Sequence, residues 1–408
     1  MKNANNITIK SNTEKTTIPA IIKYMGSKKP IIDFIISSID DIHISGAVVC
    51  DLFSGSCSIS AALRKKYDFI SNDIQEYSNI LAQTYFSDLS KYDLLSLEKE
   101  IKSTAEIHVK YFEDNYKDFF YDYSLINNID DYQRIELKQR KLEKEKFDID
   151  YHLFVKHYSG TYWSFEQCVW LDALRKCAEN YKGQKIYYAI ISSIMHCMSY
   201  TTQSTGHFAQ YRDGNSIDAI NNIIIYRLKN IFEIFLKKLG ELIITLDNHL
   251  KTVNTTTLTF TECLKKVPNG STIYADPPYA PVHYSRFYHA LETLVRYDYP
   301  ELEFKGRYRS DRHQSPFSQK TKAIQAFKEL FEGIISAKSQ MILSYSGSGV
   351  VPIDTIILLA EKHFLDGYNI EIKEVDHKHS TMGRFEDQNR DVIEYLVIAK
   401  FSNYECAN

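Results

Sequence analysis

Residues 47–73 read AVVCDLFSGSCSISAALRKKYDFISND, and the order of elements in this stretch decides the fold class. The β-branched run at 47–52 predicts a buried strand, and the small residues at 54–58 predict a tight turn. An amphipathic helix is expected from about Ile59 to Lys66, followed by a second strand over Phe69–Asn72. Strand, turn, helix and strand form one βαβ unit, which is typical of an open α/β sheet.

Both ends of the chain carry further patterns of this kind. Towards the N-terminus, residues 31–36 predict a helix whose opening turn contains Pro30. Towards the C-terminus, residues 320–337 predict a helix that lies between two strands. Three apolar runs predict the C-terminal strands: 271–275, 341–345 and 392–401. The two ends are therefore expected to build one α/β sheet.

The middle of the chain has a different pattern. From about Leu81 to Leu250, long polar and aromatic segments repeat with helical period. The stretch Arg134 to Lys146 alternates Lys, Arg and Glu, which predicts a solvated helical face more than a contact with DNA. We expect one discontinuous catalytic domain, residues 18–84 and 251–408. A mostly helical region at 85–250 is inserted into it.

Composition limits the classes of function. The chain has 408 residues and a formal net charge of −3, which argues against general coating of nucleic acid but allows a local basic surface. Its seven cysteines form no C-x-x-C pair and no metal-like spacing, so they predict reduced thiols and no metal site. Residues 1–15 are polar, and no apolar run approaches the length of a membrane span. These features predict a soluble cytoplasmic protein without membrane contact.

The turn after the first strand is a candidate nucleotide site. Residues 51–57 contain Gly55, which allows a ligand to approach the backbone closely, and the helix that follows presents free N–H groups. Asp73 lies 18 residues beyond Gly55, at the end of the second strand. An acidic residue at that place in an open sheet reaches the hydroxyls of a ribose. The alternative is an ordinary βα turn followed by a polar loop.

A second chemical motif, Asp276-Pro277-Pro278-Tyr279, follows the predicted strand Thr272–Ala275. The exocyclic amine of adenine is a poor nucleophile, because its lone pair is delocalised into the ring. A carboxylate (Asp276) and a backbone carbonyl held outward by the two prolines can each accept one N–H, which favours a pyramidal nitrogen. Tyr279 offers a flat face to a base that has left its duplex. The alternative is a strand that ends in a proline-rich turn. A chance match of this stringency is on the order of one in a thousand.

Four motifs in this order resemble a known family. Residues 22–28 place Tyr24 and Lys28 around a glycine just before the first helix, where a lysine can pair with the carboxylate of an amino-acid-like cofactor. The order Lys-Tyr-Met-Gly-Ser-Lys, Asp-Leu-Phe-Ser-Gly-Ser, Asn-Asp-Ile, Asp-Pro-Pro-Tyr is similar to that of the Dam-like (D12 class) DNA adenine-N6 methyltransferases, in their alpha arrangement. The resemblance covers residues 20–85 and about 255–401.

The resemblance implies a Rossmann-like α/β fold that uses S-adenosylmethionine. It implies that Asp276 lies between the cofactor and the base, and that Tyr279 stacks on the extruded adenine. The family usually has a second glycine where this chain has Cys57, and a Cβ there crowds the turn if φ is positive, which puts cofactor affinity in doubt. The residues that it implies for cofactor binding are Tyr24, Lys28, Asp51, Phe53, Gly55, Asp73 and Asp276.

Two segments predict contacts with double-stranded DNA. Residues 305–322 contain six Lys or Arg (305, 307, 309, 312, 320, 322) against one acid (311), a local charge of +5 that suits phosphate groups. Residues 203–212 carry side chains suited to the edges of adenine and guanine. A solvated surface loop and a packed loop of the inserted region are the respective alternatives. The residues predicted to contact DNA are Arg307, Arg309, Arg312, Gln203 and Arg212.

Together these predictions describe a site-specific DNA methyltransferase that acts on the N6 amine of a flipped adenine. We expect it in a restriction-modification system or an orphan or phage methylation system, with a cognate restriction endonuclease as a candidate partner. Two alternatives remain. A cytosine-N4 methyltransferase uses the same chemistry but more often has Ser in place of Asp276. A catalytically weak DNA-binding protein on the same scaffold is motivated by Cys57.

Overall fold

The computed structural model describes five stretches of the chain: residues 18–203, 207–246, 250–365, 367–380 and 389–402. The polar N-terminal stretch at 1–15 lies outside the described residues, as do residues 204–206 of the segment 203–212. Among the described helices, none is long and apolar enough to cross a membrane.

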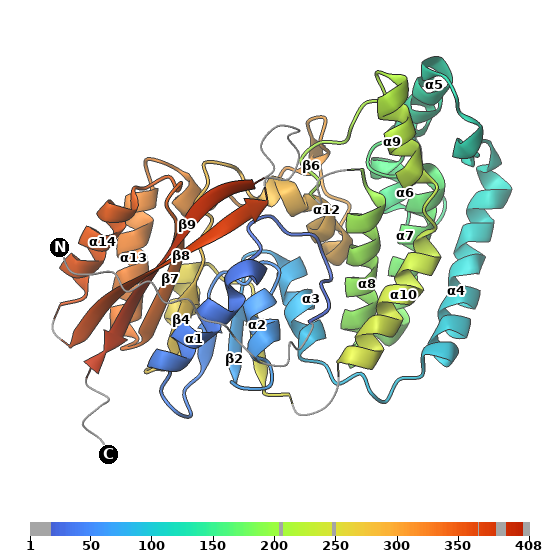
Figure 1. Ribbon diagram of the computed structural model, residues 1–408. Coiled ribbons are helices and arrows are strands. Elements are labelled where there is room, and N and C mark those ends of the chain that lie inside the picture. Colours follow the sequence, from blue (N-terminus) through green and yellow to red (C-terminus); the bar gives the residue numbers. More distant parts are fainter. Residues whose placement is uncertain (1–17, 204–206, 247–249, 366, 381–388, 403–408) are drawn as a thin grey trace.

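Seven strands of the described residues form one twisted sheet (Figure 1). Five neighbouring strands are parallel, and the two C-terminal strands pair antiparallel at one edge. In spatial order the strands are β3 (Val253–Thr256), β2 (Phe69–Asn72), β1 (Val49–Asp51), β4 (Thr272–Ala275), β7 (Gln340–Ser346), β9 (Asn389–Phe401) and β8 (Tyr368–Ser380). A separate small hairpin pairs β5 (Leu302–Glu303) with β6 (Tyr308–Arg309).

The central strands are short and buried along their whole length, which is why their sequences are continuous apolar runs. Successive side chains alternate between two cores: Val49 packs on one side of the sheet and Cys50 on the other. The same alternation holds for Tyr274 and Ile273 on β4. Both faces of the sheet therefore need a layer of helices.

Each face has its own layer. One face packs against α1 (Ile32–Ile42), α2 (Ser58–Leu63) and α3 (Glu76–Tyr85). The opposite face packs against α11 (Phe260–Leu264), α13 (Ala323–Ser336) and α14 (Ile353–His363). In α1 the buried residues Ile35, Ile39 and Ile42 recur at helical spacing, so one stripe of the helix faces the sheet. The result is a three-layer α/β arrangement (Figure 1).

The chain between α3 and β3 is helical and lies beside the sheet (Figure 1). Helix α3 packs against α8 (Lys185–Thr201), and α12 (Ser285–Arg296) contacts both, so the apolar core continues from the sheet into the helical part. The helices of this part are α4 (Leu94–Asn115), α5 (Ile129–Arg140), α6 (Leu153–Tyr158), α7 (Phe165–Ala178), α8 (Lys185–Thr201), α9 (Ile217–Arg227) and α10 (Ile231–Thr245).

The predicted α/β class is confirmed, and the strands predicted at 69–72 and 272–275 are found at those residues. The helix expected from Ile59 to Lys66 is found at Ser58–Leu63, so it begins one residue earlier and ends three residues earlier than predicted. Strands β3 and β8 were not predicted. In the case of β3 the sequence is polar (Val-Asn-Thr-Thr) and the strand is partly exposed at a sheet edge.

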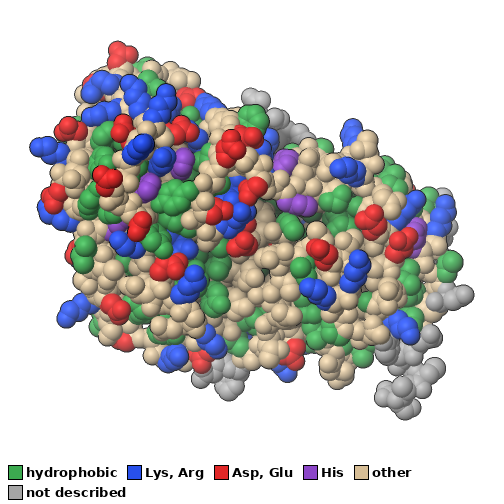
Figure 2. Space-filling view, turned by 180° about the vertical axis from the view of Figure 1, so that it is seen from behind, with side chains coloured by type: hydrophobic (Ala, Val, Ile, Leu, Met, Phe, Trp, Pro, Cys, Tyr) green, Lys and Arg blue, Asp and Glu red, His purple; other side chains and the backbone are tan. Residues whose placement is uncertain are grey.

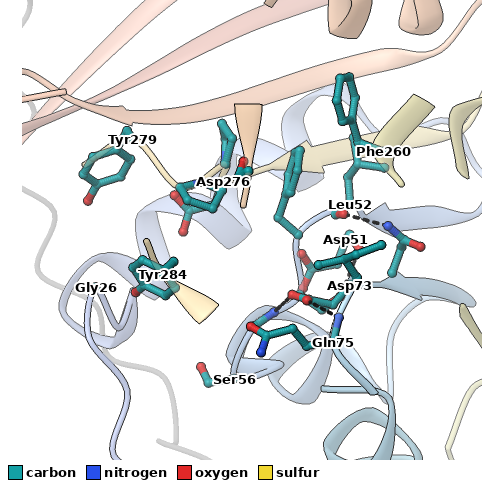
Figure 3. Close-up of a pocket in the computed structure, with 18 of the residues that line it drawn as sticks. Gly26, Asp51, Leu52, Ser56, Asp73, Gln75, Phe260, Asp276, Tyr279 and Tyr284 are labelled. Atoms are coloured by element: carbon teal, nitrogen blue, oxygen red, sulfur yellow. Dashed lines mark hydrogen bonds between the residues drawn. The ribbon is translucent and has the colours of Figure 1, made fainter. Parts of the chain in front are cut away.

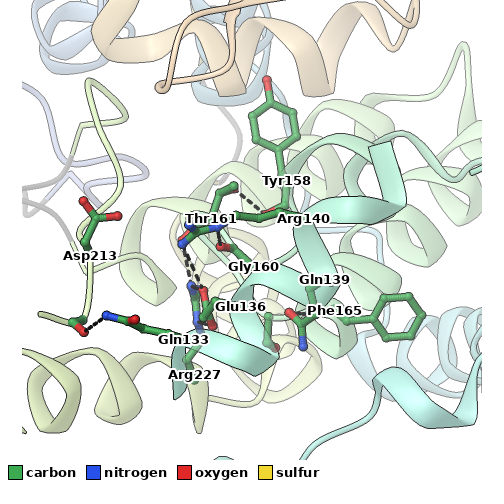
Figure 4. A network of polar contacts seen from close by, with 12 residues as sticks. Gln133, Glu136, Gln139, Arg140, Tyr158, Gly160, Thr161, Phe165, Asp213 and Arg227 are labelled. Carbon is green, nitrogen blue, oxygen red and sulfur yellow. Dashed lines mark hydrogen bonds and ion pairs between the residues drawn. The ribbon is translucent and has the colours of Figure 1, made fainter. Parts of the chain in front are cut away.

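The prediction of a solvated helical face at 134–146 is wrong in part. Glu136 and Gln139 of α5 are buried, and so is Leu142 in the 3-10 turn that follows. Glu136 accepts hydrogen bonds from the buried Arg227 at 2.9 and 3.3 Å (Figure 4). The alternating charges concealed a buried ion pair, because its partner lies 91 residues away in the sequence.

Candidate active site

Three acidic residues meet at one edge of the sheet. Asp51 ends β1, Asp73 follows β2 and Asp276 follows β4, and these three strands are parallel neighbours with β1 in the middle. The chain leaves β1 towards β2 on one side, whereas β4 and β7 continue on the other, so β1 and β4 flank a topological switch point. Ligands bind at such points in open α/β sheets. A cavity of about 360 Å³ lies there and is lined by all three acids (Figure 3).

The turn after β1 is braced by Asp73. The backbone N–H of Gly55 donates to Asp73 Oδ2 at 2.9 Å, and that of Gln75 donates to Oδ1 at 2.9 Å (Figure 3). Burial raises the pKa of Asp73, and these backbone hydrogen bonds oppose the shift. Gly55 has φ +48°, and a Cβ there would lie 2.4 Å from the Tyr24 hydroxyl oxygen. The turn therefore requires glycine at this position.

Asp51 places a second acid deep in the cavity. Its Oδ2 accepts a hydrogen bond from Ser60 Oγ at 3.0 Å, and its Oδ1 is buried without a hydrogen-bond partner among the described residues. Burial raises the pKa of Asp51 to about 7. An unsatisfied buried acceptor is costly, so a donor from a ligand, such as an ammonium group, fits this oxygen.

Cys57 does not face the cavity. Its backbone is left-handed, with φ +58°, as expected for a position that the family usually fills with glycine. The side chain is fully buried, with Sγ 3.2 Å from the carbonyl oxygen of Ser78. It is absent from the cavity lining, whereas Gly55 and Ser56 belong to it. The Cβ therefore crowds the helical layer behind the turn and not the ligand space.

The motif that follows β4 enters the same cavity from the other side. Asp276 keeps 21% of its side-chain surface exposed, and Lys28 Nζ lies 3.1 Å from its Oδ1. The second oxygen, Oδ2, has no hydrogen-bond partner in the part of the chain that the structure describes. Tyr279 is half-buried, with its ring 5.4 Å from that of Tyr345 at 64°. The cavity thus offers a free carboxylate oxygen beside an aromatic ring (Figure 3).

Lys28 is engaged by two carboxylates. Besides Asp276, its Nζ lies 2.5 Å from Oε1 of Glu394 on β9, and Glu394 is buried. Burial alone would lower the pKa of Lys28, but Asp276 and Glu394 outweigh it and raise the pKa well above its usual value. For Asp276, burial raises the pKa to about 6, Lys28 lowers it and Glu394 raises it. The lysine expected to pair with a cofactor carboxylate is therefore already bound to protein acids.

Tyrosines close the side of the cavity near Lys28. The Tyr24 ring stacks on Tyr288 at 4.7 Å and 17°, and Tyr284 donates a hydrogen bond to the carbonyl oxygen of Met25. Tyr24 and Tyr284 both line the cavity, as do the half-buried Phe53 and the buried Phe260. An apolar lining with a few polar groups is typical of a small-molecule site.

Arg309 is wrongly predicted as a DNA contact. Its side chain is 2% exposed and pairs with Asp298 at 2.6 Å and with Asp311 at 3.0 Å. Four of its five N–H donors are bound to these two carboxylates, and its burial keeps it from phosphate. Instead it fastens the β5–β6 hairpin to the end of α12.

Two more cations of the basic segment are paired with acids from elsewhere in the chain. Lys305 pairs with Asp213, and Arg307 pairs with Glu143. Arg312 lies over the Tyr308 ring at 4.8 Å, and its nearest described carboxylate oxygen, from Glu303, is 4.0 Å away. On the face seen in Figure 2, Lys and Arg side chains lie intermixed with Asp and Glu over the helical part. Acids from elsewhere in the chain thus offset part of the local charge of +5, whereas Lys320 and Lys322 are exposed and form no ion pair among the described residues.

The segment at 203–212 approaches the same region. Phe208 N donates to the carbonyl oxygen of Phe287 at 2.7 Å, and Tyr308 donates to the carbonyl oxygen of Ala209, so the loop is tied to α12 and β6. Arg212 is exposed, whereas Oε1 of Gln203 is buried without a hydrogen-bond partner among the described residues. Neither side chain lines the cavity.

Sequence reasoning missed Glu394 and Arg286. Glu394 interrupts an apolar run, Ile393-Glu394-Tyr395-Leu396-Val397, and a lone acid on a buried strand is a usable signal. Arg286 starts α12 beside the cavity and has no ion-pair partner among the described residues. Within those residues, no group of three or more His, Cys, Asp or Glu side chains could hold a metal ion.

The sequence of the chain matches one family model and is similar to three known proteins. The model of a family described as D12 class N6 adenine-specific DNA methyltransferase matches residues 24–167 and 215–343. The modification methylase LlaI of Lactococcus lactis subsp. lactis is 25% identical over 384 residues, 92% of this chain and 55% of that protein. The modification methylase StsI of Streptococcus sanguinis is 22% identical over 92% of this chain and 51% of its own. The type II methyltransferase M.FokI of Planomicrobium okeanokoites is 24% identical over 84% of this chain and 47% of its own. The chain spans about half the length of these relatives.

Proposed function

Because the chain belongs to the D12 class of N6 adenine-specific DNA methyltransferases, we propose that it methylates the N6 amine of a flipped adenine in double-stranded DNA. The observation that carries the proposal is the single cavity that joins the Gly55 turn to Asp276 and Tyr279. A methyl donor on the turn and a base beside Tyr279 would meet at the carboxylate between them. The relatives named as modification methylases support a role in a restriction-modification system, with a cognate endonuclease as a partner.

We propose S-adenosylmethionine as the cofactor, which supplies a methyl group already activated by its sulfonium centre. The residues present fit it: the turn at Gly55 admits no Cβ, and the free buried oxygen of Asp51 suits an ammonium group. Asp73 lies where it can reach a ribose, and Phe53 lines an apolar end of the cavity. Tyr24 lies against the Gly55 turn, and Lys28 lies beside Asp276. Lys28 is the sole Lys or Arg among the described lining residues, and it is shared with Asp276 and Glu394.

The chemistry assigned to the protein is orientation of the amine. Asp276 Oδ2 accepts one N–H of the adenine amine, while Oδ1 remains with Lys28, and the nitrogen lone pair is directed at the methyl group. A methylated amine has one proton to release, and the ionised carboxylate of Asp276 would accept it. Holding both reactants in line accounts for most of the acceleration such a site requires. We assign Pro277 and Pro278 to holding the backbone between Asp276 and Tyr279.

The proposed DNA surface consists of side chains outside the cavity lining. We retain Arg307, Arg312, Gln203 and Arg212 as proposed contacts and withdraw Arg309. We add Arg286, because its guanidinium is not committed to a carboxylate and it lies near Arg312. Both arginines, after burial, help to lower the pKa of His283. Residues 85–250 are the proposed target-recognition region.

The proposal is tested by Asp276→Ala with tritiated S-adenosylmethionine and DNA, followed by nucleoside analysis of the product. We expect N6-methyladenine from the wild type and none from the variant, with DNA binding retained. Asp118→Ala, at an exposed position of the helical part, is the matched control and should keep full activity. Turnover of Asp276→Ala within tenfold of wild type, about 1.4 kcal/mol of barrier, would remove the assigned role. A product of N4-methylcytosine would favour the cytosine alternative, and absence of labelled DNA would favour a binding protein.

A further inference from the structure

Glu394 is the buried acid that faces the proposed catalytic carboxylate. It lies on β9, in register with Ser346 of β7 and Val375 of β8. Side chains two residues apart on a strand share one face, and Leu396 and Ile398 pack in the core on the α1 side of the sheet. Glu394 therefore points to that side too, where the chain enters α1 through Lys28. The two residues are 366 positions apart in the sequence.

Three side chains form an asymmetric bridge around one ammonium. Lys28 Nζ lies 2.5 Å from Glu394 Oε1 and 3.1 Å from Asp276 Oδ1. Ser344 Oγ donates to the same Oε1 of Glu394 at 2.6 Å, which fixes that carboxylate on β7. Side-chain exposure is 7% for Lys28 and 1% for Glu394, whereas Asp276 keeps 21%. The buried carboxylate thus holds the lysine more closely than the accessible one does.

This arrangement resolves a conflict in the demands on Asp276. A buried carboxylate tends to take up a proton, which would destroy its ability to accept an N–H from an amine. A lysine bound to Asp276 alone would keep it ionised but would occupy it tightly and reduce its basicity. A second carboxylate that draws the lysine away moderates this effect. A buried ion group is costly unless all its members are satisfied, so its presence here calls for a reason beyond stability.

We propose that Glu394 is a positioning residue for methyl transfer: it anchors Lys28 at a set distance from Asp276, so that Lys28 keeps Asp276 ionised without occupying the oxygen that accepts the substrate amine. This inference rests on the proposed function and deepens it. Glu394 does not touch the reacting atoms. Its influence passes through Lys28 and through the field of its own charge.

Other groups also act on Asp276. Those that face it from the surrounding elements are Lys28 before α1, Asp51 on β1, Tyr274 on β4, Tyr279 after β4, Tyr284 before α12 and Glu394 on β9. The tyrosine pKa values are raised by burial, so these phenols are neutral at the pH of interest. Burial raises the pKa of Asp51 to about 7, and this residue is unchanged in every variant below. Charge changes at Lys28 and Glu394 can therefore be compared directly.

The test is the pH profile of single-turnover methylation at saturating cofactor and DNA, for Glu394→Gln and for Lys28→Met. The wild-type rate should rise with pH through about 6, where Asp276 ionises. Loss of the Glu394 charge removes an anion and leaves the whole of Lys28 to Asp276, so the acid limb should move to lower pH and the plateau should fall. Loss of Lys28 should move the limb to higher pH. Each shift should be about one pH unit, as for a single charge at this range.

Controls separate this role from a structural one. Glu371→Gln on β8 removes an exposed acid and should leave the limb in place. Should Lys28→Met leave Glu394 too poorly satisfied to fold, the double variant Lys28→Met/Glu394→Gln removes both buried charges together. Lys28 has the larger effect on Asp276, so the double variant should still move the limb upward, but less than Lys28→Met does.

The outcomes are distinct. Limbs displaced in opposite directions by the two single variants support the inference, because a loss of packing would move neither. The role of Glu394 is overturned if the acid limbs of the two variants coincide with that of the wild type, or if both move in the same direction. Neither result would contradict the proposal that the protein methylates DNA. Failure of the proposed function would be visible separately, since the wild-type protein would then label no DNA at any pH.

Discussion

At the scale of single residues, two left-handed positions define the turn that we assign to the cofactor. Gly55 and Cys57 both have positive φ, at +48° and +58°, but they face opposite sides. Gly55 touches the Tyr24 hydroxyl and the cavity, whereas the Cys57 thiol is buried against Ser78. A positive φ is strained for any residue with a Cβ, and the buried thiol contacts offset that strain at Cys57. Loss of the family's second glycine therefore need not alter the ligand space.

Gly55→Ala should weaken the binding of S-adenosylmethionine by at least about tenfold, or 1.4 kcal/mol. The added Cβ would collide with the Tyr24 hydroxyl, so either the turn or the ring must move. Calorimetric titration measures the affinity. Cys57→Ala is the matched control, and its affinity should equal that of wild type. An equal loss in both variants would show that Cys57 also shapes the cofactor site.

Tyr279→Ala should lose stacking on the extruded adenine worth about 1–3 kcal/mol, by analogy with aromatic platforms for single strands. Tyr279→Phe should retain most activity, since the ring face is the part that we assign to the base. The readouts are the methylation rate and the fluorescence of 2-aminopurine at the target position, which should brighten when the base leaves the helix. If Tyr279→Phe were as inactive as Tyr279→Ala, the hydroxyl and not the ring face would be the group needed for activity. That hydroxyl lies near Lys28.

At the scale of elements, buried ion pairs decide how the helices of the 85–250 region fit together. Glu136 on α5 accepts from Arg227 on α9 and from the Tyr123 hydroxyl at 2.9 Å. Arg227 also donates to the carbonyl oxygen of Thr161 at 2.7 Å, so one guanidinium joins three segments (Figure 4). The side chains of this pair are each 2% exposed. Such a pair specifies helix packing, because misaligned helices would leave its charges unpaired.

Glu136→Gln should lower the free energy of unfolding by about 3–5 kcal/mol, because it leaves Arg227 buried without a counter-charge. Arg134→Ala on the same helix removes an exposed pair with Asp131 and should cost about 0–1 kcal/mol. The midpoint of thermal unfolding for both variants checks this difference. Equal midpoints would show that water reaches Arg227 and satisfies it.

Arginines near the β5–β6 hairpin have two different roles. Arg309 is buried and stabilises the fold, whereas Arg286 and Arg312 are the ones that we propose for DNA contact. Arg286→Ala combined with Arg312→Ala should weaken DNA binding and flatten its salt dependence, by about 0.9 in log–log slope for each lost phosphate contact. Arg309→Ala should leave the slope unchanged but destabilise the protein, because Asp298 and Asp311 lose the more buried of their two described arginine partners and keep only Arg296. DNA titrations at several salt concentrations measure both slopes. A flattened slope for Arg309→Ala alone would restore it to the DNA surface.

At the scale of the whole molecule, the site exists because distant parts of the chain close on one sheet edge. Asp51 and Asp73 come from the first two strands, Asp276 comes after the helical region, and Glu394 comes from β9, which lies between β7 and the edge strand β8. The helical part shares a continuous apolar core with the sheet through α3, α8 and α12. The elements proposed to position DNA are thereby packed directly against those that hold the cavity.

The local patterns of the chain were sufficient for the α/β class, for the strands at 69–72 and 272–275, and for the convergence of Gly55, Asp73 and Asp276. Those features depend on alternation, turn residues and the rule that parallel strands end at one edge, all of which can be read along the chain. Fold and motif order were accordingly predicted well.

The partners of charged side chains could not be read in this way. Arg309 carries the same sequence signal as a phosphate-binding arginine, and its burial depends on Asp298 and on the hairpin that brings them together. The pairing of Glu136 with Arg227, and of Glu394 with Lys28, spans 91 and 366 residues. Charge acts through space and not along the chain, so only the packed fold determines which charges are neutralised, which remain free for DNA, and which are directed at Asp276.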